Sequence, residues 1–430
     1  MSASKDRART ILSLIKEKYS ISKLVERQKP KPDTPFPPSI RSTKKISLSA
    51  LENYWRILLQ QTEADETDKN LIADPETCDN LEVFQNNIEN CIGTVKVPLG
   101  IIGPLRINGI FAQGDYYIPL ATTEATLVAS YGRGAKLISA CGGCTTALLN
   151  DGISRTPAFA FQTLTEAGLF TEWLNDSFDA LKEVAEATTR FGKLVDIRTH
   201  MEGNHVYLIC EYFTGDASGQ NMSTIATEAL CHFIAEHTPF APEYWLLESN
   251  FSGDKKAAAA SFFTVRGKKA TAEVLIPNEL IEKYLHTDVD TMYRSWRMAA
   301  LGGVMSGTIG VHFHYANGLT ALYLATGQDA ACASESSVGI TRTEIRDGNL
   351  YASVTLPNIM AGTVGGGTKL PTQSAGLKIL GLQGEGKVHA FAEVCAATCL
   401  AGELSLIGAM CAGHFAGAHQ KLARGHNGKK

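Results

Sequence analysis

The sequence predicts an α+β protein with a large discontinuous domain around a long central helix, a smaller inserted domain, and a helical N-terminal region. Three patterns predict this class. Residues 8–27 place apolar side chains at helical spacing, residues 157–249 alternate strand-like and helical segments, and the chain after residue 301 has long helical stretches rich in Gly and Ala. Small side chains let helices approach closely, as packing around a central helix requires.

The N-terminal region, residues 1–87, is predicted to be helical. Residues 8–27 show apolar side chains at roughly helical spacing on a charged background. A connector with five prolines follows, and such a run excludes a regular helix. Ser49 and Glu52 then form a capping-box pattern ahead of a helix around Tyr54–Gln61.

Residues 157–247 form the predicted inserted domain. The segments are Ala158–Phe161, Leu164–Thr188, Leu194–Met201, Val206–Phe213, Ser223–His237 and Tyr244–Leu247, in the order β-α-β-β-α-β. Gly203 and Asn204 are a turn-prone pair between the two central strands. This order is the split βαβ pattern of ferredoxin-like domains. Because it interrupts the chain, the large domain is predicted to comprise residues 88–156 and 248–430.

The large domain is predicted to contain three long helical segments, Gly302–Gly327, Gln373–Leu382 and His389–Ala418. Its most apolar stretch, Phe391–Phe415, is interrupted by Glu393, Glu403 and His414. Charged residues inside so short an apolar stretch favour a buried core helix over a membrane span.

Composition narrows the class of protein. The chain has 430 residues, 44% hydrophobic and 20% charged, which is typical of a globular protein with two or three domains. A net charge of −4 without a long basic run argues against nucleic-acid binding. Ten cysteines without a compact disulfide framework, and no apolar signal core at the start, predict a cytoplasmic protein without a membrane segment. The lone Cys141-Gly-Gly-Cys144 motif lacks a second pair of ligands, so we predict no metal.

Four charged residues lie in apolar or glycine-rich segments far apart in the sequence, namely Glu124, Lys255, Asp329 and His419. Burying an unpaired charge is costly, so they are expected to be buried together in one polar site. Such a site can polarise a carbonyl, relay a proton and protonate a leaving group. Structural alternatives remain, because Asp-Lys-Lys is often a solvated turn, a carboxylate can cap a helix, and a His can bond a core carbonyl.

Two further segments are suited to a phosphate-rich cofactor, although the ordinary G-x-G-x-x-G dinucleotide motif is absent. Asp216–Met222 leads into a helix whose first N–H groups can bind an anion. Gly362–Thr368 contains four glycines that allow the backbone to approach an anion closely. Each segment alone is also compatible with a glycine-rich turn that binds nothing.

Taken together, these segments resemble the catalytic region of 3-hydroxy-3-methylglutaryl-coenzyme A reductases of the eukaryotic and archaeal kind. The resemblance runs in family order from about residue 85 to 420, about four-fifths of the chain. The matching segments are Glu89–Gly93, Pro119–Glu124, Asp151–Arg155, Asp216–Met222, Asp254–Lys256, Gly327–Ala331, Gly362–Thr368, Ala401–Leu406 and Gly413-His414.

The resemblance implies an NADPH-dependent reduction of the acyl-CoA thioester to mevalonate by two hydride transfers. Glu124 would donate a proton near the substrate carbonyl, Lys255 would stabilise the oxyanion, Asp329 would tune both, and His419 would protonate the departing CoA thiolate. It also implies a homodimer, or a dimer of dimers, with active sites at the subunit interface.

The resemblance also implies binding residues. The NADP(H) site would lie on the inserted domain and the glycine segment, at Thr189, Arg190, Phe191, Asp216, Ser218, Asn221, Met222, Gly365, Gly366 and Gly367. The substrate would contact Glu89, Asn90, Arg155, Asp254, Lys256 and Asn317.

Two positions depart from the family pattern at the acyl group. The family has a Ser six residues before the Asp of Asp-Lys-Lys, where this chain has Glu248, with Ser249 one position later. The family also has a Lys before the small-residue helix, where this chain offers only Arg297 as a substitute, shifted by one position. These departures keep an alternative open, a related reductase acting on a different acyl-CoA or a carrier-bound thioester. A third hypothesis is a regulator that binds CoA or NADP without catalysis.

Overall fold

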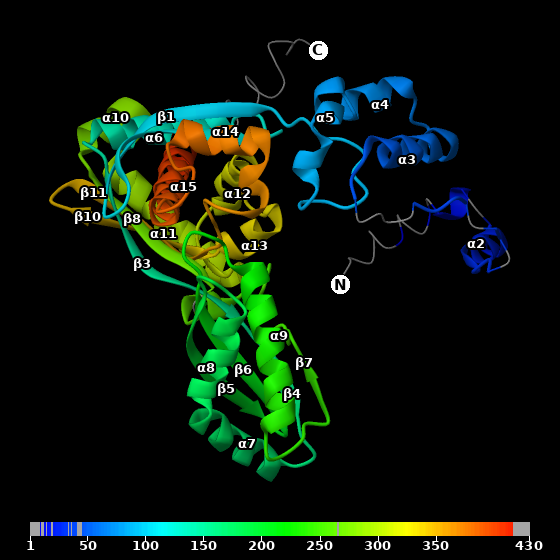
Figure 1. The fold of residues 1–430 in the computed structure, drawn as a ribbon. Coiled ribbons are helices and arrows are strands. Elements are labelled where there is room, and N and C mark those ends of the chain that lie inside the picture. The colour runs from blue at the N-terminus through cyan, green and yellow to red at the C-terminus, as the bar shows by residue number, and fades with distance from the viewer. Residues whose placement is uncertain are drawn as a thin grey trace. The chain divides into compact units, whose positions relative to one another are not determined.

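The computed structural model describes residues 9, 13, 15–18, 20–32, 34–35, 37–40, 45–264 and 266–415. The chain divides into two compact units, residues 1–94 and residues 95–430, and each has its own hydrophobic core. Figure 1 labels the helices and strands of both units.

The first unit is helical, as predicted. Its elements are α2 (Ile21–Gln28), α3 (Leu48–Gln61), α4 (Glu66–Ile72), α5 (Pro75–Asp79) and the 3₁₀ turn η1 (Leu81–Phe84). Leu51 and Trp55 of α3 form its small core with Leu81 and Cys91, and the Trp55 indole N–H donates to the Ile92 carbonyl at 2.8 Å. No helix forms in the described residues between 30 and 40, as the proline run predicted.

The predicted start of α3 is wrong by two residues. Ser47 caps this helix, with an extended backbone (φ −154°, ψ 155°) and a hydroxyl that accepts the Ala50 N–H at 3.2 Å. Ser49 already lies inside the first turn. An N-cap requires a non-helical backbone, and the sequence offers two serines without showing which one adopts it.

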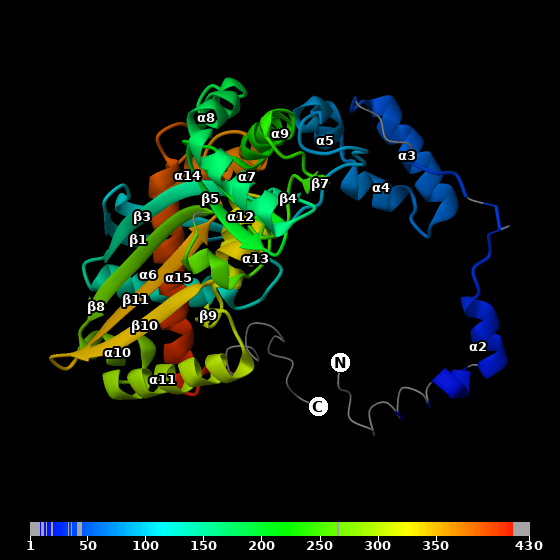
Figure 2. The same cartoon turned by 90° about the horizontal axis from the view of Figure 1, so that it is seen from below.

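A mixed sheet runs through the second unit in the order β7-β4-β6-β3-β8-β11-β10-β9, while β1 pairs with β2 and β3, and β5 pairs with β6. The strands of the larger part are β1 (Leu99–Gly109), β2 (Gln113–Ala121), β3 (Cys144–Arg155), β8 (Gly267–Ile276), β9 (Gly310–Val311), β10 (Gly339–Arg346) and β11 (Asn349–Ile359). Figure 2 shows β3, β8, β11 and β10 side by side. The predicted α+β class is therefore confirmed.

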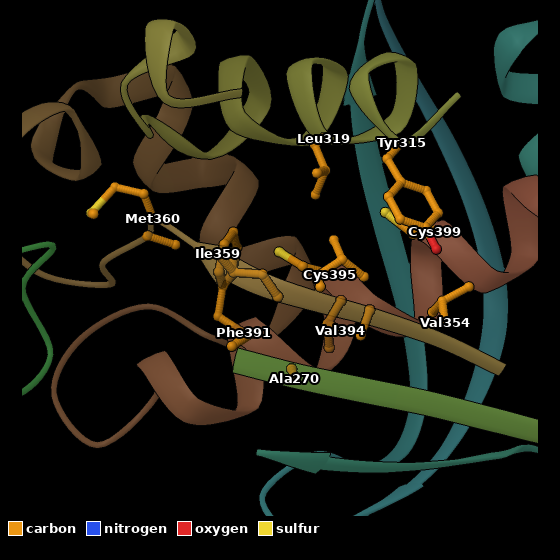
Figure 3. Close-up of a cluster of buried hydrophobic side chains, with 14 of the residues drawn as sticks. Ala270, Tyr315, Leu319, Val354, Ile359, Met360, Phe391, Val394, Cys395 and Cys399 are labelled. Carbon is orange, nitrogen blue, oxygen red and sulfur yellow. The ribbon is translucent and has the colours of Figure 1, made fainter. Parts of the chain in front are cut away.

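The helix α15 (Val388–Cys411) is the centre of the second unit. It is buried over nearly its whole length and packs against β8 and β11 on one side and α12 (Tyr315–Thr326) on another. Figure 3 shows Phe391, Val394 and Cys395 of α15 in this layer. A Cβ at Gly134 of α6 (Leu127–Ala140) would lie 1.8 Å from the Ala401 carbonyl oxygen, so this close helix crossing requires glycine.

The same helix is the one helix among the described residues that is long and apolar enough to cross a membrane. In the most apolar window of α15, 83% of the residues are buried inside the protein. The helix therefore has the surroundings of a core helix, as its charged residues predicted.

Shorter helices surround this core, and one prediction for them is wrong. They are α6 (Leu127–Ala140), η2 (Ala259–Phe262), α10 (Asn278–Leu285), α11 (Val289–Ser306), η3 (Ala330–Cys332), α13 (Ala333–Ser336), η4 (Gly366–Lys369) and α14 (Pro371–Leu380). The predicted helix Gly302–Gly327 is instead the end of α11, the short strand β9, and α12. Gly307, the residue after α11, has φ of 76°, and this left-handed backbone ends the helix.

A smaller antiparallel sheet with three helices extends from the larger part (Figure 1). Its elements are β4 (Ala158–Ala160), α7 (Leu164–Asp176), α8 (Phe178–Ala187), β5 (Lys193–Glu202), β6 (His205–Phe213), α9 (Gln220–His237) and β7 (Tyr244–Leu246). The strand order is β7-β4-β6-β5, and all these pairs are antiparallel. The predicted single helix Leu164–Thr188 is two helices broken at Ser177, because the polar residues there favour helix ends.

Candidate functional site

Lys255 and Asp329 form an ion pair, with 2.9 Å between Nζ and Oδ2. Lys255 follows β7 in a tight loop and has φ of 55°, and the Ser334 hydroxyl donates to its carbonyl at 2.7 Å. Asp329 lies between α12 and η3 and accepts the Ala331 N–H at 3.0 Å. The fold thus brings together two of the four predicted catalytic residues from distant stretches of sequence.

The ion pair keeps both side chains charged. The hydrogen bond to Asp329 raises the pKa of Lys255. Burial raises the pKa of Asp329, but its hydrogen bonds with Lys255 and Ala331 outweigh burial and leave this pKa lowered. Lys255 is therefore a fixed cation near neutral pH, which suits it to stabilise a developing oxyanion.

The prediction that these charges are buried is wrong for one chain by itself. The side chains of Lys255 and Asp329 are 44% and 46% exposed, and Glu124 is also exposed. Contact with water removes the desolvation penalty on which that prediction relied.

Glu124 lies near the other end of α12 from this ion pair. Its Oε2 accepts the Asn317 side-chain N–H at 2.7 Å, and Asn317 is in the first turn of α12. Asp329 follows the last turn of the same helix. At 1.5 Å per residue, Asn317 and Gly327 are about 15 Å apart along the axis. A single chain therefore holds Glu124–Asn317 and Lys255–Asp329 as two separate pairs.

A cavity of about 350 Å³ adjoins Glu124. Its lining includes Leu127, Arg133, His314, Asn317 and Leu406. Most of the exposed wall area is apolar, and Glu124, Arg133, His314 and Asn317 place polar groups on it, which is typical of a small-molecule site.

His314 is a residue in this cavity that the sequence analysis missed. Its Nδ1 lies 3.0 Å from Oε1 of the buried Glu403, which also accepts the backbone N–H groups of Phe313 and His314 and the Thr341 hydroxyl. Burial raises the pKa of Glu403, but the hydrogen bonds from His314 outweigh it and leave this pKa lowered. Glu403 thereby fixes the ring of His314. The isolated charge of Glu403 in an apolar helix was the available signal.

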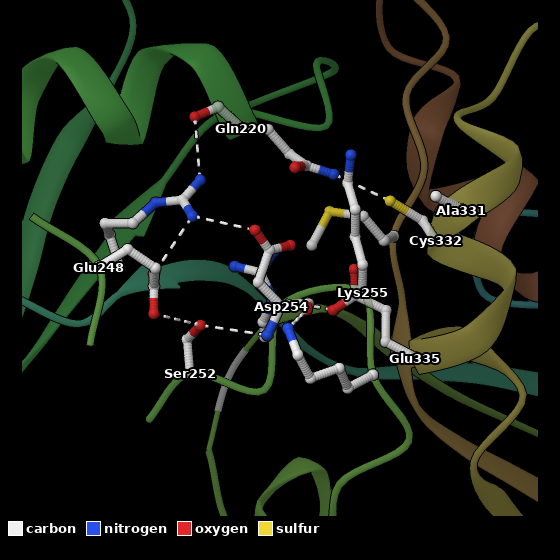
Figure 4. Close-up of polar contacts among 12 residues, drawn as sticks. Gln220, Glu248, Ser252, Asp254, Lys255, Ala331, Cys332 and Glu335 are labelled. Carbon is white, nitrogen blue, oxygen red and sulfur yellow. Dashed lines mark hydrogen bonds and ion pairs between the residues drawn. The ribbon is translucent and has the colours of Figure 1, made fainter. Parts of the chain in front are cut away.

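Beside Lys255, two guanidinium groups and three carboxylates form a network (Figure 4). Arg155 Nη1 lies 3.2 Å from Glu248 Oε2 and 3.1 Å from Asp254 Oδ2. Arg266 pairs with Asp254 and, at 2.8 Å, with Glu335. Arg266 and Glu335 were not predicted, since isolated charges in sequence show no partner. Burial raises the pKa of Glu335.

The other polar residues of the Lys255 loop have different partners. The Ser249 hydroxyl donates to the Thr156 carbonyl at 2.7 Å and so anchors the loop. Lys256 is exposed and donates to the Asp254 carbonyl at 2.8 Å.

The segments predicted to bind the cofactor lie next to one another. Thr363 N–H donates to the Asp216 carbonyl at 2.9 Å, and a Cβ at Gly362 would lie 2.7 Å from Ser218 N. Gly192 packs against the start of α9, because a Cβ at Gly192 would lie 2.1 Å from Met222 Sδ. The turn containing Thr189, Arg190 and Phe191, just before Gly192, therefore touches the start of α9. Asn221 lies in the same first turn.

This cluster reaches the residues next to the Lys255–Asp329 ion pair. Gly362 N–H donates to Gln328 Oε1 at 2.8 Å, directly beside Asp329, and Gly327 contacts the backbone of Gly367. Gly365 and Gly366 have φ of 74° and 50°, with nothing within 4 Å of an added Cβ. The glycine segment thus leaves open space beside Asp329, where a ligand can approach the backbone.

The Asp216 carboxylate has an internal role that the sequence analysis did not predict. It accepts the backbone N–H groups of Gly386, Lys387 and Val388 at 2.8, 3.1 and 3.2 Å, just before and at the start of α15. Its charge is therefore used to cap the central helix, and only its backbone faces the glycine segment.

The remaining predicted residues lie elsewhere. Glu89 and Asn90 belong to the first unit, where the Tyr54 hydroxyl donates to Asn90 Oδ1 at 3.2 Å. Arg297 is exposed on α11, with its guanidinium 5.7 Å from the Tyr293 ring centre. His419 lies outside the described residues.

The Cys141–Cys144 motif does not have the properties of a redox pair. Burial raises the pKa of Cys141 to about 11 and that of Cys144 to about 12, whereas reactive thiols have lowered pKa values. Within the described part of the chain, no group of three His, Cys, Asp or Glu residues is arranged to hold a metal ion.

Known proteins resemble this chain over most of its length. The family model for hydroxymethylglutaryl-coenzyme A reductase matches residues 51–424. The 3-hydroxy-3-methylglutaryl-coenzyme A reductase of Methanothermobacter thermautotrophicus is 45% identical over 343 residues, covering 79% of this chain and 86% of that protein. The enzyme of the same name from Methanocaldococcus jannaschii is 43% identical over 346 residues, covering 79% and 85%.

Solved structures share the fold. The 3-hydroxy-3-methylglutaryl-coenzyme A reductase of Streptococcus pneumoniae has a TM-score of 0.63 at 19% identity, covering 85% of this chain and 97% of that one. A structure of the class II enzyme from the same organism, bound to NADPH in open conformations, has a TM-score of 0.61 at 20% identity, covering 85% and 87%.

Proposed function

Since this chain belongs to the hydroxymethylglutaryl-coenzyme A reductase family, we propose that it reduces 3-hydroxy-3-methylglutaryl-CoA to mevalonate with NADPH. The observation that carries this proposal is the contact of the glycine segment with Gly327 and Gln328, the two residues that precede Asp329, the partner of Lys255. A cation for the reacting carbonyl thereby lies close to a segment where Gly365 and Gly366 leave open space, and a nucleotide cofactor can bind there.

Each of the four proposed catalytic residues then has a separate role in the reaction. Bound NADPH supplies a hydride in each of two steps. Lys255 stabilises the negative charge that develops on the carbonyl oxygen, and Asp329 holds the lysine in place. Glu124, oriented by Asn317, delivers the proton to that oxygen. His419 protonates the CoA thiolate released between the two steps, because a histidine exchanges a proton near neutral pH.

The residues 157–247 are proposed to be an inserted ferredoxin-like domain that binds NADP(H). The strand order β7-β4-β6-β5 and the order of helices support the ferredoxin-like assignment. The contact of Ser218 and Met222 with the neighbouring segments supports the cofactor site.

Removing the guanidinium of Arg190 should weaken the preference for NADPH over NADH. Arg190 is exposed in the turn after α8, and a guanidinium suits the 2′-phosphate that distinguishes the two cofactors. We expect Arg190→Ala to lower the ratio of kcat/KM for NADPH and NADH by about tenfold, a single-interaction effect. Arg198→Ala, on the same domain but paired with Glu211, is the control and should keep the wild-type ratio. A wild-type enzyme that prefers NADH would contradict the assignment of Arg190.

The active site is proposed to be shared between two chains of a homodimer. The separation of Glu124–Asn317 from Lys255–Asp329 along α12 supports this, because neither end of α12 in one chain brings both pairs together. The exposed face of α11 also supports it. Met298, Leu301, Val304 and Met305 are 65 to 83% exposed, and apolar patches of this kind mark protein interfaces. Arg297 on the same helix would then reach the acyl carboxylate in the other subunit.

The reductase activity is tested directly with purified protein. NADPH absorbance should fall when hydroxymethylglutaryl-CoA is added, with two NADPH consumed per mevalonate formed, since a thioester needs two hydrides to become an alcohol. The alternative, a related reductase for another acyl-CoA or carrier-bound thioester, is favoured by Glu248 at the acyl side. Faster turnover of such a thioester would establish the alternative, and absence of turnover with every thioester would exclude a reductase.

A further inference from the structure

Glu248 has more partners than a surface carboxylate needs. Its Oε1 accepts the Thr156 hydroxyl at 2.9 Å, the Asn250 N–H at 2.9 Å and the Ser252 hydroxyl at 3.0 Å. Its Oε2 faces Arg155 at 3.2 Å. Four bonds, two from the loop and two from the end of β3 and the residue after it, hold this carboxylate in one position against the guanidinium.

Arg155 is thereby already neutralised before any substrate arrives. It is 6% exposed, and Nη1 is shared between Glu248 and Asp254, while Nη2 lies 3.4 Å from the Gln220 carbonyl. The surrounding network contains Glu248, Asp254 and Glu335 against Arg155 and Arg266, so carboxylates outnumber guanidinium groups. A further carboxylate brought to Arg155 would meet two negative groups within contact distance of it.

The position of this network makes it relevant to the substrate. Asp254 directly precedes Lys255, so the acyl group of a thioester whose carbonyl is at Lys255 lies close to this loop. Two unit charges a few ångströms apart near a protein surface interact by several kcal/mol, which is enough to decide between a charged and a neutral acyl group.

We propose that Glu248 is the specificity-determining residue of the acyl site. It forms an ion pair with Arg155 and thereby disfavours acyl groups that would place a carboxylate beside that guanidinium. This proposal rests on the proposed function and refines it. The hydroxymethylglutaryl carboxylate must then be bound by a cation outside the network, and the enzyme should tolerate acyl groups without a carboxylate better than an enzyme with a small neutral residue at this position.

The test compares two thioesters with matched shapes, hydroxymethylglutaryl-CoA and its analogue with a primary amide in place of the distal carboxylate. Glu248→Gln preserves an acceptor for Thr156, Asn250 and Ser252 but removes the charge. We expect it to raise the ratio of kcat/KM for carboxylate over amide by about tenfold, chiefly through a lower KM for the carboxylate. Turnover of the amide should stay within about twofold of wild type.

Two controls separate charge from loop geometry. Glu248→Asp keeps the charge and should keep the wild-type ratio. Glu344→Gln, which removes a carboxylate paired with Arg346 on the β10 strand, should change neither substrate. An unchanged ratio in Glu248→Gln, or an equal loss with both thioesters, would overturn the proposal, because Glu248 would then only position the loop. Failure of the wild type to oxidise NADPH with either thioester would instead refute the proposed reduction of hydroxymethylglutaryl-CoA.

Discussion

Lys255→Ala should reduce thioester turnover by ~10²-fold or more, the size expected when one oxyanion donor is removed. Lys255 is paired with Asp329 at 2.9 Å and has a raised pKa, so its charge is present throughout the neutral range. The affinity for NADPH should stay nearly unchanged, because the segments proposed to hold the cofactor do not depend on the ammonium group. Steady-state kinetics and NADPH binding by fluorescence measure the two quantities separately.

A lysine in an ion pair outside the candidate site is the control for this variant. Lys69 lies 2.7 Å from Glu52 in the first unit, and the hydrogen bond to Glu52 raises the pKa of Lys69. Lys69→Ala should leave turnover within about twofold, since removing a surface ion pair costs little. Turnover of Lys255→Ala above a tenth of wild type would show that Lys255 is not the oxyanion donor.

The pH dependence of this ion pair follows from the two pKa directions. The raised pKa of Lys255 means that its contribution is lost only as pH rises above 10.5, through the folded-state value. The lowered pKa of Asp329 means that its contribution is lost only as pH falls below 3.8. A change in rate between these limits must therefore come from another group, such as a histidine.

Glu124→Gln should lower kcat by ~10²–10⁴-fold, the usual contribution of a general acid. Glutamine keeps an oxygen that can accept the Asn317 amide N–H, so the local fold and NADPH binding should persist. What it cannot do is deliver a proton to the carbonyl oxygen. Both half-reactions require that proton, so reduction of the thioester and of the free aldehyde should slow together. A selective effect on the thioester alone would assign Glu124 to thiolate protonation instead.

Mixing the two inactive variants tests whether the site is shared between chains. If Glu124 and Lys255 of one site come from different subunits, a heterodimer of Glu124→Gln and Lys255→Ala retains one intact site. An equal mixture after subunit exchange should then recover about a quarter of wild-type activity. No recovery, with exchange demonstrated, would place both residues in one chain.

Local patterns predicted much of the fold correctly. The β5–β6 hairpin turns at Gly203, and α15 is the buried central helix, because both depend on residues near one another in sequence. The errors were also local. Ser47 caps α3 instead of Ser49, and Gly307 ends α11 inside a predicted helix. Each helix end depends on the backbone angles of one residue, and the residue type alone does not fix those angles.

The candidate site was predictable as a set of residues but not as an arrangement. The resemblance named Glu124, Lys255 and Asp329, yet only the fold shows that the last two are paired and that Glu124 is bonded instead to Asn317 in the first turn of α12. His314 and Glu403 were missed because their contact joins segments 89 residues apart. The isolated charge of Glu403 in an apolar helix signals that it has a partner, but spacing in the sequence does not show which residue that is.

The sequence by itself determined the family, the reductase chemistry expected from it, and the positions of most secondary structure, because these depend on residue identity and short-range periodicity. The tertiary structure alone decided which charges meet. It placed Glu248 against Arg155, Asp216 at the start of α15, and the glycine segment beside Asp329. Electrostatic and hydrogen-bond energies depend on distances of a few ångströms between residues far apart in sequence, and only the folded chain sets those distances.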